Sequence, residues 1–287
     1  MKLTVLGSGS PEAYERRASS GYLIEVAGQR ILFDCGGGVF DRLLKAGLKP
    51  TDIDYIFFSH LHSDHMMDYA RLVHAAWDEG GRLPKVYGPA PIASITEKLF
   101  GKSGVFAHDL EARTGLKGSK EVWLARGGTL PRPWPAPEVT EVEPRFRVDG
   151  DGWRLSSCPV PHAQPFLECM AFAVEADGAR FVYSGDAGIT PEFESFVSGA
   201  DFLLHWCYRL SDETNVSEFY KHVAPTPAEI AAMASRNGVG ELVITHFRVH
   251  MDAPERHAAA LKELQSGFPG NSSIAEDLDA FTITPRG

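Results

Sequence analysis

The sequence predicts one α/β domain built from two packed layers, and three observations support this fold class. The chain has 287 residues, a length that large two-layer α/β domains commonly reach. Apolar residues make up 44% of it and charged residues 23%, which is enough apolar material for a sizeable core. Short β-rich runs also alternate with segments of helical period along both halves. We therefore expect a single domain over residues 1–287.

The first half begins with β-rich runs and a glycine-rich turn at residues 36–38. Strands are predicted over residues 2–6, 22–26, 31–33 and 53–58. The last of these runs directly into Ser59-His60. Apolar residues then recur with period 3.6 from Met66 to Trp77, which predicts one helix that ends at Gly80-Gly81.

The middle of the chain, about residues 101–154, is the least regular part. It is rich in proline, glycine and charge, and its apolar content is too low for a core of its own. We expect a cap-like insertion within the single domain.

The second half repeats the pattern of a strand followed by a turn. Strands are predicted over residues 153–160, 179–184, 202–204, 241–245 and 281–284. A helix begins at Thr226, because Thr226-Pro227-x-Glu229 combines an N-cap, a first-turn proline and a capping box, and Gly238 ends it. Another helix is predicted over residues 254–265.

Charge and cysteine content restrict the function. The net charge of -10 argues against a protein built mainly to grip nucleic acid, although net charge does not report its distribution. Four single cysteines without a CxxC pair exclude a thiolate zinc knuckle and a disulfide framework. The chain shows no signal peptide and no apolar run of membrane-spanning length, so we expect a cytoplasmic protein that does not bind membranes.

Four predicted strands end at a residue that can ligate a metal: His60, His162, Asp186 and His246. The strongest local signal is the motif His60-x-His62-x-Asp64-His65. Its extended part places His60 and His62 on one side, and Asp64 and His65 are offset at the turn into the helix. The motif therefore predicts half of each of two adjacent metal sites. Asp186 would bridge the two metals, His162 would complete the first site and His246 the second.

The ordered set of motifs resembles the metallo-β-lactamase superfamily, and within it the branch that holds tRNase Z and related phosphodiesterases and arylsulfatases. The resemblance covers nearly the whole chain and rests on Leu6-Gly7-Ser8-Gly9-Ser10-Pro11, Ser19-Ser20, Phe33-Asp34-Cys35-Gly36, residues 60–65, Tyr87-Gly88-Pro89, Pro161-His162, Ser184-Gly185-Asp186 and Thr245-His246-Phe247. It implies an αββα sandwich of two mixed sheets flanked by helices. It also implies a dinuclear zinc site at one edge of the sheets, although manganese or iron would suit the same ligands.

Two departures from that branch concern the substrate. The tRNase Z enzymes carry a basic arm between the ligands that match His162 and Asp186, and too few residues lie between them here. The branch also has a His-Glu-Ala-Thr motif, which aligns with His205-Trp206-Cys207-Tyr208 and lacks the glutamate. Its His-Ser-Thr motif falls near His222, but at a different spacing from Thr226.

We expect a metal-dependent hydrolase in which metal-bound hydroxide attacks a small ester-like substrate, a phosphodiester or an aryl sulfate. Asp64 would ligate and orient the nucleophile, and His222 would protonate the leaving group. For His222 a solvated loop position is an equal alternative, and for His205 a buried, backbone-bonded position is as favoured as a pocket role.

Other functions remain as alternatives. They are a tRNA 3′-end endonuclease, a lactone or β-lactam hydrolase, and a non-catalytic zinc-stabilised binding protein. A redox role ranks low because no fused flavin domain is visible. The expected partner is a small-molecule substrate and not nucleic acid, and a homodimer is left open.

Overall fold

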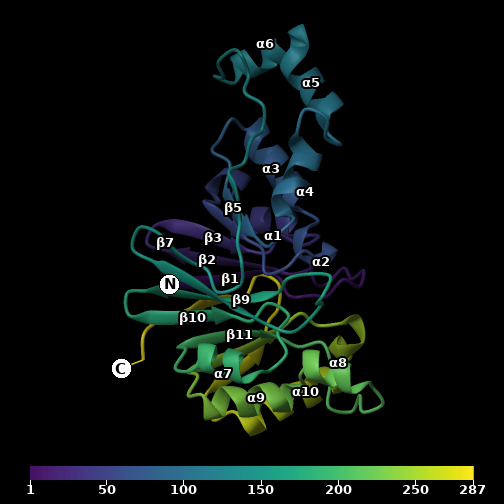
Figure 1. The fold of residues 1–287 in the computed structure, drawn as a ribbon, viewed down its shortest axis with the longest axis vertical. Helices are drawn as coiled ribbons and strands as arrows, with labels where there is room; N and C mark the ends of the chain where they lie inside the picture. Colours follow the sequence, from purple (N-terminus) through teal and green to yellow (C-terminus); the bar gives the residue numbers. More distant parts are fainter. Residues whose placement is uncertain (287) are drawn as a thin grey trace.

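The computed structural model describes residues 1–286, and within them the strands form two sheets of seven strands each. Figure 1 shows the sheets face to face at the centre of the molecule, with helices on the outer side of each. This αββα arrangement of two mixed sheets confirms the expected fold class.

The first sheet has the order β14-β1-β2-β3-β4-β5-β6. Its strands are β1 (Lys2–Gly7), β2 (Gly21–Val26), β3 (Gln29–Phe33), β4 (Tyr55–Phe57), β5 (Lys85–Gly88), β6 (Val139–Glu141) and β14 (Ala280–Thr282). Its outer side carries α1 (Val39–Lys45), the short helix η1 (Pro50–Asp52), α2 (Ser63–Met66), α3 (Tyr69–Asp78) and α4 (Ile92–Phe100).

The second sheet has the order β13-β12-β11-β10-β9-β8-β7. Its strands are β7 (Arg147–Asp149), β8 (Arg154–Pro159), β9 (Met170–Ala176), β10 (Ala179–Tyr183), β11 (Phe202–Trp206), β12 (Glu241–Thr245) and β13 (Asn271–Ile274). The helices of this half are α7 (Pro191–Val197), α8 (Glu218–Val223), α9 (Pro227–Arg236), η2 (Val249–Asp252) and α10 (Pro254–Gly267).

An aromatic core joins the two sheets. Phe33 on β3 lies 5.3 Å from Phe172 on β9, ring centroid to centroid, and all atoms of both residues are buried. Side chains on one face of each strand point into this layer because successive residues alternate across a sheet. Burial of a large apolar side chain contributes about 1.5–3 kcal/mol, so this layer holds the sheets together.

The capping box at the start of α9 is confirmed, because the Thr226 side chain accepts a hydrogen bond from the Glu229 amide and Glu229 bonds back. The single helix expected from Met66 to Trp77 is instead two helices, α2 and α3. Asp68 lies between them, and its carboxylate accepts the amide protons of Gly38 and Phe40 at the start of α1. That contact ties the junction of the two helices to the start of α1.

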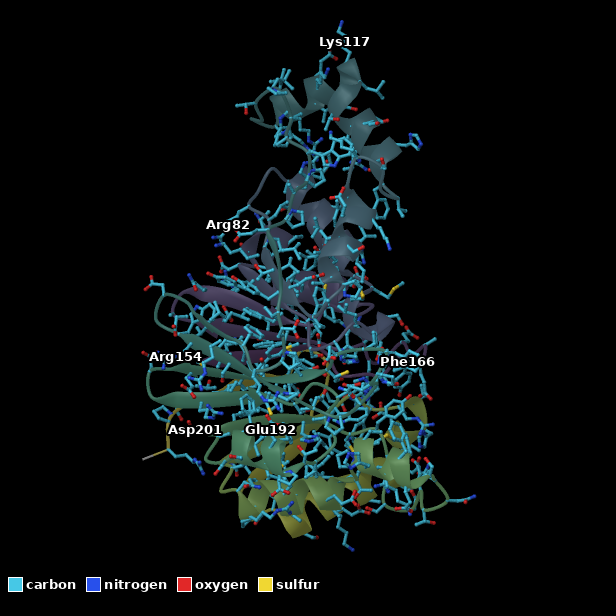
Figure 2. All side chains as sticks on the ribbon, in the orientation of Figure 1. Arg82, Lys117, Arg154, Phe166, Glu192 and Asp201 are labelled. Atoms are coloured by element: carbon cyan, nitrogen blue, oxygen red, sulfur yellow. The ribbon has the colours of Figure 1, made fainter. Side chains whose placement is uncertain are left out.

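The segment expected to be irregular contains two helices, α5 (Ala107–Gly115) and α6 (Lys117–Ala125). They form a tip at one end of the molecule's longest axis, with Lys117 at its far end (Figures 1 and 2). At its base the Arg132 guanidinium lies between the rings of Trp77 and Trp123, 3.8 and 4.5 Å from their centroids, and pairs with Asp78. We name residues 101–137 the tip.

Strand direction determines where polar residues gather. β3 and β4 are parallel, and so are β10, β11 and β12, which brings the carboxyl ends of strands from both sheets to one edge. The loops after β4, β8, β10 and β12 hold His60, His162, Asp186 and His246. Among residues 1–286, no helix is both long and apolar enough to cross a membrane.

Candidate metal centre

The structure brings all the residues predicted as metal ligands together at this edge. They form three overlapping groups, and within each group the donor atoms lie within 4.8 Å of one another. The groups are His60, His62 and His162; His60, His65 and Asp186; and Asp64, His65 and His246.

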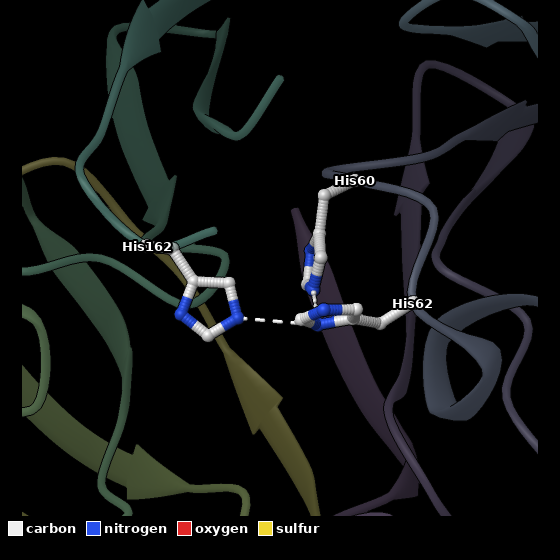
Figure 3. Close-up of side chains that lie close together, drawn as sticks. All are labelled: His60, His62 and His162. Carbon is white, nitrogen blue, oxygen red and sulfur yellow. Dashed lines mark hydrogen bonds between the residues drawn. The ribbon is translucent and has the colours of Figure 1, made fainter. Parts of the chain in front are cut away.

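The first group consists of histidines from two loops, and Figure 3 shows their rings converging. His60 Nε2 lies 3.0 Å from His62 Nδ1, and His162 Nε2 lies 3.2 Å from the same atom. His60 and His62 follow strand β4, whereas His162 follows β8 in the other sheet. Three ring nitrogens that point into one small volume are better placed to coordinate a shared cation than to hydrogen-bond one another.

The group of Asp64, His65 and His246 lies beside the group of three histidines. His246 Nε2 is 3.2 Å from Asp64 Oδ2, and His65 Nε2 is 3.6 Å from the same oxygen. Asp186 lies between the groups, with its Oδ2 3.4 Å from His246, 3.5 Å from His65 and 3.5 Å from His162. One carboxylate therefore faces both groups, which is the position that a bridging ligand needs.

Two buried atoms support a cation in this position. His65 Nε2 and Asp186 Oδ1 are buried and have no hydrogen-bond partner within residues 1–286. A buried polar atom without a partner is unfavourable, and a metal ion would satisfy both. The donor set of imidazoles and carboxylates fits zinc.

Electrostatics keep most donors in their metal-binding forms. Burial and the neighbouring His65 hold the pKa of His60 well below its usual range, and burial lowers the pKa of His162 to about 4. Burial would raise the pKa of Asp186, but the charges of His246 and His65 outweigh it and lower that pKa. Burial would lower the pKa of His65, but the charges of Asp186 and Asp34 outweigh it and raise that pKa. The His65 imidazole therefore favours binding either a proton or a metal ion.

Asp34 orients the centre, and its role was missed from sequence. Its fully buried carboxylate accepts hydrogen bonds of 2.8 Å from His65 Nδ1, 2.8 Å from the Ser59 hydroxyl and 2.7 Å from the Tyr183 hydroxyl. A carboxylate on the far nitrogen of an imidazole fixes the tautomer and turns the other nitrogen toward the metal. Asp34 directly follows β3, as His60 follows β4, so the strand-end signal was present.

Glycine is required at one contact below the centre. A Cβ on Gly36 would lie 2.0 Å from the backbone oxygen of Asp64, so no other residue fits without moving the loop. The glycine turn after β3 therefore packs directly against the metal-binding motif.

Two other candidate residues lie elsewhere. His205 is fully buried, its Nδ1 lies 2.7 Å from the Trp206 backbone oxygen, and its ring faces Phe193. His222 is exposed on α8, and within residues 1–286 no hydrogen bond or ion pair joins it to the cluster. The structure thus favours the buried, backbone-bonded reading of His205.

Aromatic side chains that the sequence did not single out form a wall beside the cluster. The Trp206 ring lies 5.1 Å from the ring of His162 and 5.5 Å from that of His246. Tyr208 lies 5.5 Å from His246. Trp206 stands where the resemblance would place a glutamate, so an apolar face replaces a carboxylate there.

Comparisons with known proteins agree with this geometry. The family described as "Beta-lactamase superfamily domain" matches residues 29–247. A protein named Ribonuclease Z from Mycobacterium bovis is 28% identical over 295 residues, covering 100% of this chain and 99% of the relative.

Two solved structures share the fold. The metallo-β-lactamase fold protein YhfI from Bacillus subtilis has a TM-score of 0.75 at 21% identity, with 98% of this chain and 99% of that chain covered. The short form of human tRNase Z has a TM-score of 0.70 at 19% identity, with 99% and 100% covered.

These names correct one expectation. The sequence predicted a small-molecule substrate and no nucleic acid, and that prediction is wrong because the full-length curated relatives are named Ribonuclease Z. The error has a physical cause. A net charge of -10 describes the whole chain, whereas nucleic acid responds to local charge.

Proposed function

The chain belongs to the metallo-β-lactamase superfamily and is a hydrolase, and we propose that it is a ribonuclease Z-like phosphodiesterase that cleaves RNA, with precursor tRNA as the preferred substrate. The observation that carries the proposal is the position of Asp186 between two groups of histidines. The full-length likeness to proteins named Ribonuclease Z supports RNA as the substrate.

We propose two metal ions, with zinc as the first choice. His60, His62 and His162 would hold one ion, Asp64, His65 and His246 the other, and Asp186 both. Such ions supply an activated water at neutral pH and positive charge for a phosphate. Asp64 is buried in the cluster, with its Oδ2 3.2 Å from His246 Nε2, so its carboxylate would both help to hold the ion and orient the attacking water.

The protein's own residues shape the rest of the reaction site. The Trp206 and Tyr208 wall places aromatic rings beside His246, where they would limit the access of water. We assign no proton transfer to His222, because it has no contact with the cluster in the described chain and the metals can stabilise the leaving oxygen.

Local positive charge supports an RNA substrate despite the acidic chain. The tip holds six Lys or Arg residues against three Asp or Glu residues. Its lysine side chains include Lys117, which is 92% exposed. Arg113, Arg126 and Arg132 pair with Asp78, so phosphate contacts are expected at the lysines of this protrusion.

The test is cleavage of a 3′-extended precursor tRNA by the zinc-loaded protein, with an Asp64→Asn variant. We expect the variant to lose activity by about a hundredfold or more, because metal binding and water orientation both depend on the carboxylate. The matched control is Asp54→Asn, since Asp54 precedes β4 at the end opposite His60. Full activity of Asp64→Asn, or no cleavage of any RNA by the loaded wild type, would overturn the proposal.

A further inference from the structure

A polar cavity lies away from the metal centre. It has a volume of about 570 Å³ and is lined by residues of β7, β8, β9, β10 and α7. None of the proposed metal ligands lines it. Figure 2 labels Arg154 and Glu192 from its lining, which lie on the same side of the molecule. We name it the arginine cavity, after Arg145, Arg147, Arg154 and Arg180.

Strand alternation explains why these arginines gather. Leu155 on β8 and Phe181 on β10 point into the aromatic core between the sheets. Their neighbours Arg154 and Arg180 therefore point to the outer face of the same sheet. Arg147 reaches that face from β7, which pairs with β8. Arg147, Arg154 and Arg180 are thus positioned by the strands, and Arg145 lies just before β7.

The cavity carries more positive than negative charge. Its lining contains two carboxylates, Glu175 and Glu192. Arg145 forms two hydrogen bonds to Glu192, at 2.8 and 2.9 Å, Arg180 pairs with Glu175, and Arg154 pairs with Asp149 beside the lining. The guanidinium of Arg147 has no ion pair or hydrogen bond within residues 1–286.

Hydroxyl groups complete the set of donors. Ser156, Ser157 and Ser195 also line the cavity. Guanidinium groups offer paired N–H donors that match the oxygens of a phosphate, and hydroxyls add single donors. Phe196 and Cys158 are the members of the lining without a charged or hydroxyl group. This chemistry selects an oxyanion over an apolar ligand.

We propose that the arginine cavity is a phosphate-binding site distinct from the metal centre. Its phosphates come either from the backbone of the RNA or from a free oligophosphate. Binding of RNA phosphates at this cavity rests on the proposed function, whereas binding of a free oligophosphate does not. β8 links the two sites, because it begins at Arg154 and ends three residues before His162.

The test uses the full-length protein, with inorganic tripolyphosphate as the free probe in calorimetry and precursor tRNA in cleavage assays. The variant is Arg147→Ser combined with Arg154→Ser, and Arg147→Ser alone serves if the pair unfolds. The control is Arg82→Ser, since Arg82 is 69% exposed and paired with Asp54, much as Arg154 is 59% exposed and paired with Asp149.

We expect tripolyphosphate to bind the double variant at least tenfold more weakly, with the control unchanged. If RNA is the source, the KM for RNA also rises and the salt dependence of RNA binding falls by about one unit per arginine removed. A change with tripolyphosphate alone assigns the cavity to a free oligophosphate. Wild-type binding of both probes by the double variant overturns the proposal. Loss of RNA cleavage by the wild type would refute only the proposed function, since the tripolyphosphate titration still reports on the cavity.

Discussion

Replacing Asp34 with asparagine should weaken metal binding although no proposed ligand is replaced. The Asp34 carboxylate accepts four hydrogen bonds, and three of them converge on Oδ2, from Ser59, His65 and Tyr183. Asparagine can place its oxygen at that position only by turning its NH₂ group toward the Ser59 N–H, and in the reverse orientation the NH₂ group cannot accept the three hydrogen bonds. The Nδ1 proton of His65 would then face another donor.

In that orientation, His65 can avoid the contact between two donors by moving its proton from Nδ1 to Nε2. That tautomer directs a proton instead of a lone pair at the metal position. Loss of such a supporting partner lowers metal affinity by about 10- to 100-fold, which corresponds to about 1.4–2.7 kcal/mol. Stability should also fall, because hydrogen bonds to a charged group contribute about 1.5–3 kcal/mol each.

The assay is competition for zinc against a chromophoric chelator, with thermal unfolding as the check on the fold. Tyr183→Phe removes a single donor and should change zinc affinity by less than about threefold. Asp201→Asn is the control, because that carboxylate also accepts backbone N–H groups, at 2.7 and 2.9 Å, but lies outside the cluster. A folded Asp34→Asn protein with wild-type zinc affinity would refute the reasoning.

Three further predictions concern other parts of the chain. Burial lowers the pKa of His205 to about 4, below the unfolded value of about 6.5, so the unfolded state binds more protons in that window. Stability should therefore fall by roughly 3 kcal/mol as pH drops from 6.5 to 4, and denaturant titrations of His205→Leu should show a smaller fall. Phe166 is 90% exposed in the loop after His162, and Phe166→Ala should raise the KM for RNA about tenfold if a base stacks on it, whereas Phe166→Trp should not. The Arg17 side chain is fully buried against Asp252, and Arg17→Met should lower the free energy of unfolding by about 3–5 kcal/mol in denaturant titrations. Adding Asp252→Asn should restore part of that loss, and additive effects of the two substitutions would contradict the coupling.

The fold was predictable where strands ended in turns or ligands, and less so elsewhere. Strand β9 (Met170–Ala176) went unpredicted because it is buried on both faces. Large residues such as Phe172 face the other sheet, and Ala171 and Ala173 face the helix layer. No polar alternation marks such a strand. The tip helices were missed because glycines interrupt them and because Asp78, outside the segment, anchors them through Arg113, Arg126 and Arg132.

The ligand cluster was accessible from sequence because His60, His162, Asp186 and His246 follow strand ends, the rest of the motif follows His60 directly, and parallel strands end at one edge. Asp34 obeyed the same rule but was passed over, since a carboxylate after a strand is also a common turn residue. The Trp206 and Tyr208 wall could not be found this way. Their approach to His246 depends on how β11 and β12 align, and only the register shows it.

The substrate prediction failed because it used the net charge of the chain and ignored where the charged residues lie. The centre places Asp34, Asp64 and Asp186 together, and their charges help to attract a metal while they add to the acidic total. Two divalent cations, bound as proposed, would more than neutralise the carboxylates and turn the same edge into a site for phosphate. The carboxylates that make the chain look unsuited to RNA are therefore among the residues that would prepare it to bind RNA. Measuring RNA affinity before and after zinc loading tests this: affinity should rise at least tenfold on loading, and equal affinity would contradict the argument.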